Sequence, residues 1–165
     1  PLVLVSHDGE INRGFELWSA LYSAGDVSPT SFGLSVHNAL AGQWSMLRGD
    51  MSEHTALAIA DEALECALLD ACGFLHDGAP QVLVVFADEA LAPDYAVHGV
   101  QRPPFAHALA LLLQPGQEWR ISRHDPLPDQ PPADWGALGF LRQHFLGNRQ
   151  WQQHYARRRW QWQQN

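Results

Sequence analysis

The sequence predicts an α/β domain, because strand-like apolar runs alternate along it with segments of helical periodicity. The run 82–87 is continuously β-branched and aromatic, which is typical of a central strand covered on both faces. The chain has 165 residues, of which 46% are hydrophobic and 17% are charged. A single domain over 1–165 is therefore long enough to bury its own core.

The first elements follow from short-range patterns. Residues 2–6 form an apolar run that predicts a buried strand, and 7–9 is the turn that ends it. We expect Asn12 to cap a helix, because apolar residues recur at helical spacing from there until Gly25.

The stretch 28–46 is too broken for a single helix or strand. Ser28 precedes a proline, which biases it away from a helical conformation. Apolar and small residues alternate over 32–36, as in a short half-buried strand. The small residues over 39–42 predict a turn into a closely packed helix, where the backbone passes near another backbone or a ligand.

The second half contains a further strand, a connector and an unusual tail. Residues 106–113 form an apolar run of strand length, and the proline-rich segment 115–134 is expected to be an exposed connector. Residues 135–165 are aromatic and rich in Gln, with five Arg and no acidic residue. The preceding 134 residues carry five Arg against eighteen acids, and so acidic a body argues against general nucleic-acid affinity.

Composition also limits location and cofactors. No apolar run approaches the roughly 20 residues that span a bilayer, and the first residues lack a basic secretion signal. Cys66 and Cys72 predict two buried thiols in a reducing compartment, so we expect a cytoplasmic protein. No nucleotide-binding motif occurs and the histidines lack ligand spacing, so we expect no cofactor and no metal.

Four segments together resemble a known family. They are VLVSHDGEINRGFELWSAL at 3–21, SPTSFGLSVHNALAGQWS at 28–45, VLVVFADEAL at 82–91 with the Pro-Asp-Tyr that follows, and RRRWQW at 157–162. In this register the chain resembles the β-ketoacyl synthase-like N-terminal domain family of the thiolase superfamily. The small members of that family occur in aryl polyene biosynthesis and look like chain-length factors.

The resemblance implies the N-terminal half of a thiolase-like fold, in which helices cover the faces of a mixed β-sheet. Helix propensity alone would draw one long helix over 55–75, whereas the family implies a short strand over 55–60 and a helix from about Glu62. Asp61 would cap that helix. Such halves meet another half across a sheet edge, so a lone half should leave apolar surface exposed.

The residues argue against condensation by this chain alone. Condensing enzymes of the superfamily hold a cysteine at a strand-to-helix elbow, where the helix N-terminus lowers the thiol pKa, and take two further groups from the second half of the fold. The corresponding elbow at 59–62 contains no cysteine, and Cys66 lies about one turn inside the helix. An acidic residue at the elbow would repel an enolate or a thioester oxygen.

Two groups of polar residues have alternative interpretations. His37 and Asn38 either form a dimer contact or tunnel wall, or they stabilise a turn through local hydrogen bonds. The pair His7-Asp8 is expected to be a solvated turn rather than a metal or acid/base site.

The tail also has two interpretations. The cluster at 157–160 could bind an acidic acyl carrier protein through Arg157, Arg158, Arg159 and Trp160. Equally, the aromatic residues Trp151, Tyr155, Trp160 and Trp162 could anchor the tail onto the acidic body of this same domain, which we favour.

The resemblance implies a non-catalytic subunit of the chain-length-factor type, paired with a catalytic ketosynthase in aryl polyene or fatty-acid-like elongation. The residues expected at its pocket or interface are Phe32, Leu34, His37, Asn38, Leu40 and Asp61. The alternative is a stand-alone acyltransferase or thioesterase-like enzyme that uses His37 or Cys66. A third possibility is a purely structural module of a biosynthetic complex.

Overall fold

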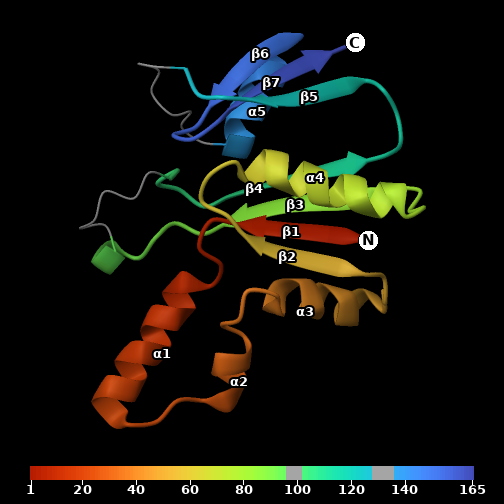
Figure 1. Ribbon diagram of the computed structural model, residues 1–165. Coiled ribbons are helices and arrows are strands. Elements are labelled where there is room, and N and C mark those ends of the chain that lie inside the picture. Colours follow the sequence, from red (N-terminus) through yellow and green to blue (C-terminus); the bar gives the residue numbers. More distant parts are fainter. Residues whose placement is uncertain (96–101, 128–135) are drawn as a thin grey trace.

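Two β-sheets enclose a helix in the computed structural model, which describes residues 1–95, 102–127 and 136–165 (Figure 1). The N-terminal sheet has the order β2-β1-β3-β4, in which β1, β2 and β3 are parallel and β4 is antiparallel to β3. Its strands are β1 Leu2–Ser6, β2 His54–Ala58, β3 Val82–Asp88 and β4 His107–Leu113. The predicted mixed sheet is confirmed, and β3 is one of its two central strands.

The C-terminal sheet is antiparallel and has the order β5-β7-β6. Its strands are β5 Trp119–His124, β6 Gln150–His154 and β7 Arg159–Gln164. The predicted connector over 115–134 is therefore wrong for its first part, because β5 pairs with β7 there. The rest of that connector, from 128, lies outside the described residues.

The helices differ in how much of their surface is covered. They are α1 Ile11–Ala24, α2 Pro29–Gly33, α3 Ala39–Arg48, α4 Ala63–His76 and α5 Gly136–Phe145, and a 3₁₀ turn spans Pro93–Tyr95. The helical spacing of Leu64, Leu68, Ala71 and Leu75 predicts a buried stripe on α4, and all of these are buried except Leu75, which is half-buried. Among the described residues, no helix is long and apolar enough to cross a membrane.

The core is continuous from one sheet to the other through α4. Val3, Val5 and Val84 form one wall of it and the tryptophans of β6 and β7 form the other. Trp151 and Trp162 stack with their ring centroids 5.5 Å apart. The C-terminal sheet and α5 thus cover α4 within this same chain.

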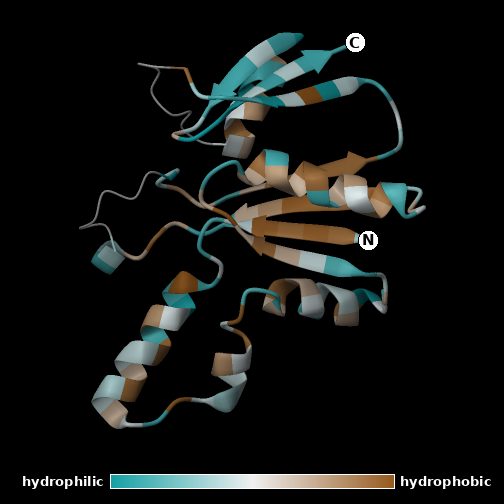
Figure 2. Cartoon of the chain, in the orientation of Figure 1, coloured by the Kyte–Doolittle hydropathy of each residue, from teal (hydrophilic) through white to brown (hydrophobic). Residues whose placement is uncertain are grey.

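The opposite face of the N-terminal sheet is only partly covered. Ala41 is the one buried residue of α3, which packs near β2, and the outward residues of β4 remain exposed. The prediction that the central strand is covered on both faces is therefore wrong, because β3 alternates between buried and half-buried residues. Figure 2 shows that the strands of this sheet are nevertheless largely hydrophobic.

The stretch 28–46 forms helices rather than the predicted strand. Pro29 occupies the first position of α2, and Ser28 caps this helix by accepting a hydrogen bond from the Ser31 amide at 3.3 Å. Asn12 does not cap α1, because the helix begins at Ile11 after Glu10. The Asn12 side chain instead accepts a hydrogen bond from the Ala92 amide at 2.9 Å.

Candidate functional site

A tight turn at the carboxyl end of the N-terminal sheet joins β2 to α4. Glu62 occupies the N-cap position of α4 with φ 62° and ψ 25°, although its side chain makes no capping hydrogen bond. It is the single non-glycine residue with positive φ in the described chain. This conformation costs on the order of 1–3 kcal/mol, so surrounding contacts must hold it. The prediction that Asp61 caps the helix is wrong, because the N-cap position falls one residue later, at Glu62.

The Glu62 carboxylate is bound by the C-terminal sheet. Trp160 Nε1 donates a hydrogen bond to Glu62 Oε2 at 2.7 Å, and Arg158 Nη1 lies 3.5 Å from the same oxygen. Glu62 is 8% exposed and sits at the amino end of α4, where the helix dipole also favours negative charge. The elbow therefore holds a fixed carboxylate that cannot act as a nucleophile in the manner of a thiolate.

A second carboxyl, one turn further along α4, is fully buried. Tyr155 Oη donates to Glu65 Oε2 at 2.9 Å, and Trp162 Nε1 donates to Glu65 Oε1 at 3.1 Å. Gln153 Nε2 in turn donates to Tyr155 Oη at 2.9 Å. Burial is the main cause that raises the pKa of Glu65, and burial likewise raises the pKa of Tyr155.

The raised pKa of Glu65 makes folding stability pH-dependent. Because the folded chain binds this proton more tightly than the unfolded chain, the contribution of Glu65 is fully present below its ordinary pKa of 4.5 and is lost as pH rises from there through the folded pKa. We expect Glu65→Gln to flatten this decline in the free energy of unfolding, measured by urea denaturation at a series of pH values. An unchanged slope would assign the pH dependence to another group.

The space beside the elbow is too small for an acyl chain. A cavity of about 80 Å³ lies between Glu62, Asp61, His107 and the ends of β1 and β3. Ligand sites of drug-like size usually enclose about 300–1,000 Å³, so this cavity fits only a few water molecules. Asp61 thus lines a small cavity at the elbow, whose lining combines apolar and charged residues.

The predicted solvated turn at His7-Asp8 is instead part of a partly buried ion cluster. Arg102, whose side chain is 5% exposed, pairs with Asp8, and His7 Nδ1 lies 2.8 Å from Asp8 Oδ2. The His7 amide also donates to Asp88 Oδ1 at 2.8 Å. Within residues 1–95, 102–127 and 136–165, no group of three or more His, Cys, Asp or Glu side chains is arranged to hold a metal ion.

A larger cleft lies on the partly covered face of the N-terminal sheet. It encloses about 410 Å³. Its lining includes His37 just before α3, Leu40 on α3, Leu4 on β1 and Ala108 on β4. His37 packs so closely on Gly9 that a Cβ there would lie 2.5 Å from His37 Nδ1. We name this space the His37 cleft.

The other predicted pocket residues do not line the His37 cleft. Phe32 and Asn38 are exposed and Leu34 is half-buried, and none of the three lines it. Asn38 instead precedes the first residue of α3 without capping it through its side chain. The sequence therefore identified two residues of the cleft and grouped them with four that lie elsewhere.

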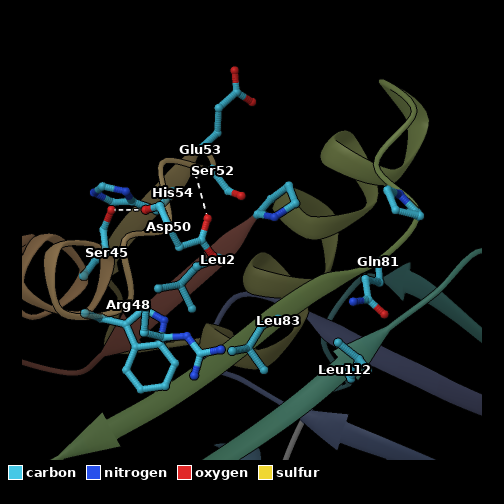
Figure 3. A pocket seen from close by; sticks show the side chains of 14 residues that line it. Leu2, Ser45, Arg48, Asp50, Ser52, Glu53, His54, Gln81, Leu83 and Leu112 are labelled. Atoms are coloured by element: carbon cyan, nitrogen blue, oxygen red, sulfur yellow. Dashed lines mark hydrogen bonds between the residues drawn. The ribbon is translucent and has the colours of Figure 1, made fainter.

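A second cleft on the same face encloses about 520 Å³ (Figure 3). Leu2, Leu83 and Leu112 contribute its apolar surface. Figure 3 shows Arg48 extending from α3 toward Leu83. The Arg48 guanidinium lies 4.9 Å from the centre of the Trp44 ring and makes a cation–π contact with it.

Neither cysteine has the surroundings of a nucleophile. Burial, followed by the charges of Glu62 and Glu65, raises the pKa of the Cys66 thiol. A raised pKa leaves less thiolate at neutral pH, so Cys66 is a poor attacking group. The prediction that both thiols are buried is wrong for Cys72, which is exposed, and Cys66 is partly buried.

The tail divides into a buried and an exposed part. Trp151, Tyr155, Trp160 and Trp162 are buried, which confirms that the tail is anchored on its own domain. Trp160 therefore does not belong to an exposed docking surface. Arg157 and Arg158 line an open groove of about 450 Å³ together with Arg123, His124 and Asp125.

Sequence reasoning missed the roles of Glu62, Glu65 and Tyr155. A signal was present, because two acids three residues apart at the start of an otherwise apolar helix cannot both face solvent without exposing its leucines. The tail has five Arg and many aromatic donors but no acid, and it supplies the missing partners.

Comparisons with known proteins place this geometry. Residues 1–163 match the family model described as the N-terminal domain of β-ketoacyl synthase. The chain is similar to one in the structure of the ketosynthase ApeO in complex with its chain length factor ApeC from Xenorhabdus doucetiae, with a TM-score of 0.86 and 23% sequence identity. The similarity covers 99% of this chain and 68% of that one. At this identity it shows a thiolase-like fold, and no curated protein matches the sequence.

Proposed function

This chain belongs to the β-ketoacyl synthase N-terminal domain family, and from that premise we propose that it is a non-catalytic subunit of the chain-length-factor type. It pairs with a catalytic ketosynthase and bounds the space in which an acyl chain grows. The pathway that we propose is aryl polyene or fatty-acid-like elongation.

The observation that carries the proposal is the state of the elbow. Where a condensing enzyme needs a thiolate, this chain has Glu62, whose carboxylate is held by Trp160 and faces a cavity of only about 80 Å³. A negative charge there disfavours the enolate and oxyanion of a condensation. Cys66, with a raised pKa one turn later, does not replace the nucleophile.

The His37 cleft supports a role in limiting chain length. Its volume of about 410 Å³ is in the range of ligand sites, and Leu4, Leu40 and Ala108 give it apolar surface suited to an acyl chain.

The groove at Arg157 and Arg158 supports contact with an acidic carrier. Three arginines and His124 line the groove against a single acid, Asp125. Acyl carrier proteins are acidic, and a basic groove would speed their encounter with the pair.

The test is co-expression with a ketosynthase encoded nearby, followed by size-exclusion chromatography with light scattering. We expect a one-to-one heterodimer that extends acyl thioesters, and no condensation by this chain alone. In the same assay Arg157→Glu should raise the KM for the carrier without changing pairing. Turnover by the purified chain alone would instead favour the stand-alone enzyme.

A further inference from the structure

The proposed function leaves one large feature unexplained, the arm, which we define as residues 11–36. It contains α1 and α2 and extends away from both sheets (Figure 1). α1 is fourteen residues long and has no buried residue. Of the sixteen large hydrophobic residues that are exposed in the described chain, ten lie between 18 and 51.

The apolar residues of α1 form a stripe. Trp18, Leu21 and Tyr22 are three and four positions apart, which places them on one side of the helix. Trp18 is 73% exposed and Tyr22 is 96% exposed. A helix in water gains most of its stability from packing such a stripe, so the surface that covers α1 must come from outside the described chain.

Among the described residues, the contacts between the arm and the rest of the domain lie at the base of the arm. Asn12 Nδ2 donates to Glu89 Oε2 at 2.7 Å and to the Ala90 carbonyl at 2.9 Å. The rings of Phe15 and Tyr95 meet edge to face with centroids 5.2 Å apart. These contacts fix where the arm leaves the body, and the rest of α1 packs against α2 without burying any residue.

The exposed area fits a protein partner rather than a small ligand. The side chains of Trp18, Tyr22 and Phe32 in the arm expose roughly 450 Å² between them, given about 150–250 Å² for each aromatic side chain. Single apolar patches on monomers are typically a few hundred Å². The arm alone therefore supplies about half of the ~800 Å² that each side of a stable interface buries, and the exposed Met46, Leu47 and Met51 lie outside it, on α3 and the loop that follows.

Charge argues that the partner is not a second copy. In the arm the acids Glu16 and Asp26 are exposed, whereas Arg13 is its single arginine and it contains no lysine. The whole chain carries a net charge of −8. Two copies joined through this surface would bring like charges together, which costs binding free energy.

We propose that the arm is the surface that grips the catalytic ketosynthase, and that the ketosynthase meets it with apolar surface bordered by basic side chains. The identity of the partner rests on the proposed function, whereas the need for a protein cover rests on the arm itself. Asn12 and Phe15 hold the base of the arm on the domain, and the partner packs along the rest of its length.

The test compares two sets of serine substitutions in the co-expressed pair. The arm variant carries Trp18→Ser, Leu21→Ser and Tyr22→Ser. The control variant carries Phe145→Ser and Leu146→Ser, two exposed positions at the carboxyl end of α5. We expect the arm variant to weaken pairing by about 100-fold or more, since central aromatic residues dominate interfaces. The control should stay within about twofold of the unmodified chain.

A charge variant tests whether basic side chains of the ketosynthase border the interface, without removing apolar contacts. Glu16→Arg with Asp26→Arg replaces two exposed acids, so the fold is not disturbed. We expect the association rate to fall by about tenfold at low salt and the difference to shrink at high salt. An unchanged rate would contradict the basic border.

Three outcomes separate this inference from the proposed function. If the unmodified chain pairs and the arm variant pairs equally well, the arm is not the interface and the proposed function stands. If the unmodified chain ignores the ketosynthase, the proposed function fails and the partner named here fails with it. If the purified chain forms a homodimer that the arm variant loses, the occupant is a second copy and the inference is overturned.

Discussion

Trp162→Ala is expected to lower the free energy of unfolding by about 5 kcal/mol. Trp162 is 2% exposed and stacks on Trp151, so truncation leaves a large cavity between the sheets, which costs about 3–5 kcal/mol. It also removes the hydrogen bond to Glu65 Oε1 inside the core, at a cost of about 1–3 kcal/mol. Urea denaturation followed by circular dichroism measures the loss.

The chain offers a matched control for this prediction. Trp18→Ala makes the same substitution at an exposed position and should change the free energy of unfolding of the isolated chain by no more than about 0.5 kcal/mol. Trp162→Phe keeps an aromatic ring but lacks the N–H donor, so its cost should lie between the two. Equal losses for Trp162→Ala and Trp18→Ala would contradict the position of β7 in the core.

Ala108→Trp is expected to shorten the products of the reconstituted pair by about one two-carbon unit or more. Ala108 is exposed on β4 and lines the His37 cleft, so an indole ring would take up much of its roughly 410 Å³. The length distribution, measured by mass spectrometry of released acyl chains, reports the effect while pairing is monitored by light scattering.

Ala110→Trp is the control for the cleft. Ala110 lies two residues along β4 on the same face, is also exposed, and does not line the cleft. Its variant should leave product length unchanged. If both variants leave the length unchanged while pairing persists, the purely structural role is favoured over a chain-length role.

The sequence predicts the elements whose apolar residues follow a simple local pattern. The apolar run 82–87 predicts β3, of which one face is buried and the other half-buried, and the helical spacing of 64, 68 and 71 matches the buried side of α4. The strand over 55–60, which corresponds to β2, came from the family resemblance, since propensity favoured a helix there.

The elements that were missed depend on choices that local patterns leave open. Ser28-Pro29 was interpreted as unfavourable to a helix, but proline at the first helical position behind a serine cap starts one. The residue at the N-cap of α4, Glu62, is hydrogen-bonded by Trp160, 98 residues later, and no short-range pattern contains this contact. His37 and Leu40 were identified as pocket residues, whereas the opposite wall on β4 is set by strand pairing.

The place of β7 also determines when this protein can finish folding. Trp160 and Trp162 reach carboxylates that lie 98 and 97 residues earlier in the chain. During synthesis, α4 and the N-terminal sheet emerge long before these donors. One side of α4 therefore stays exposed to solvent, and prone to aggregation, until β7 is synthesised. Pairing over such distances is entropically slow, and the isolated chain should refold in milliseconds to seconds rather than microseconds.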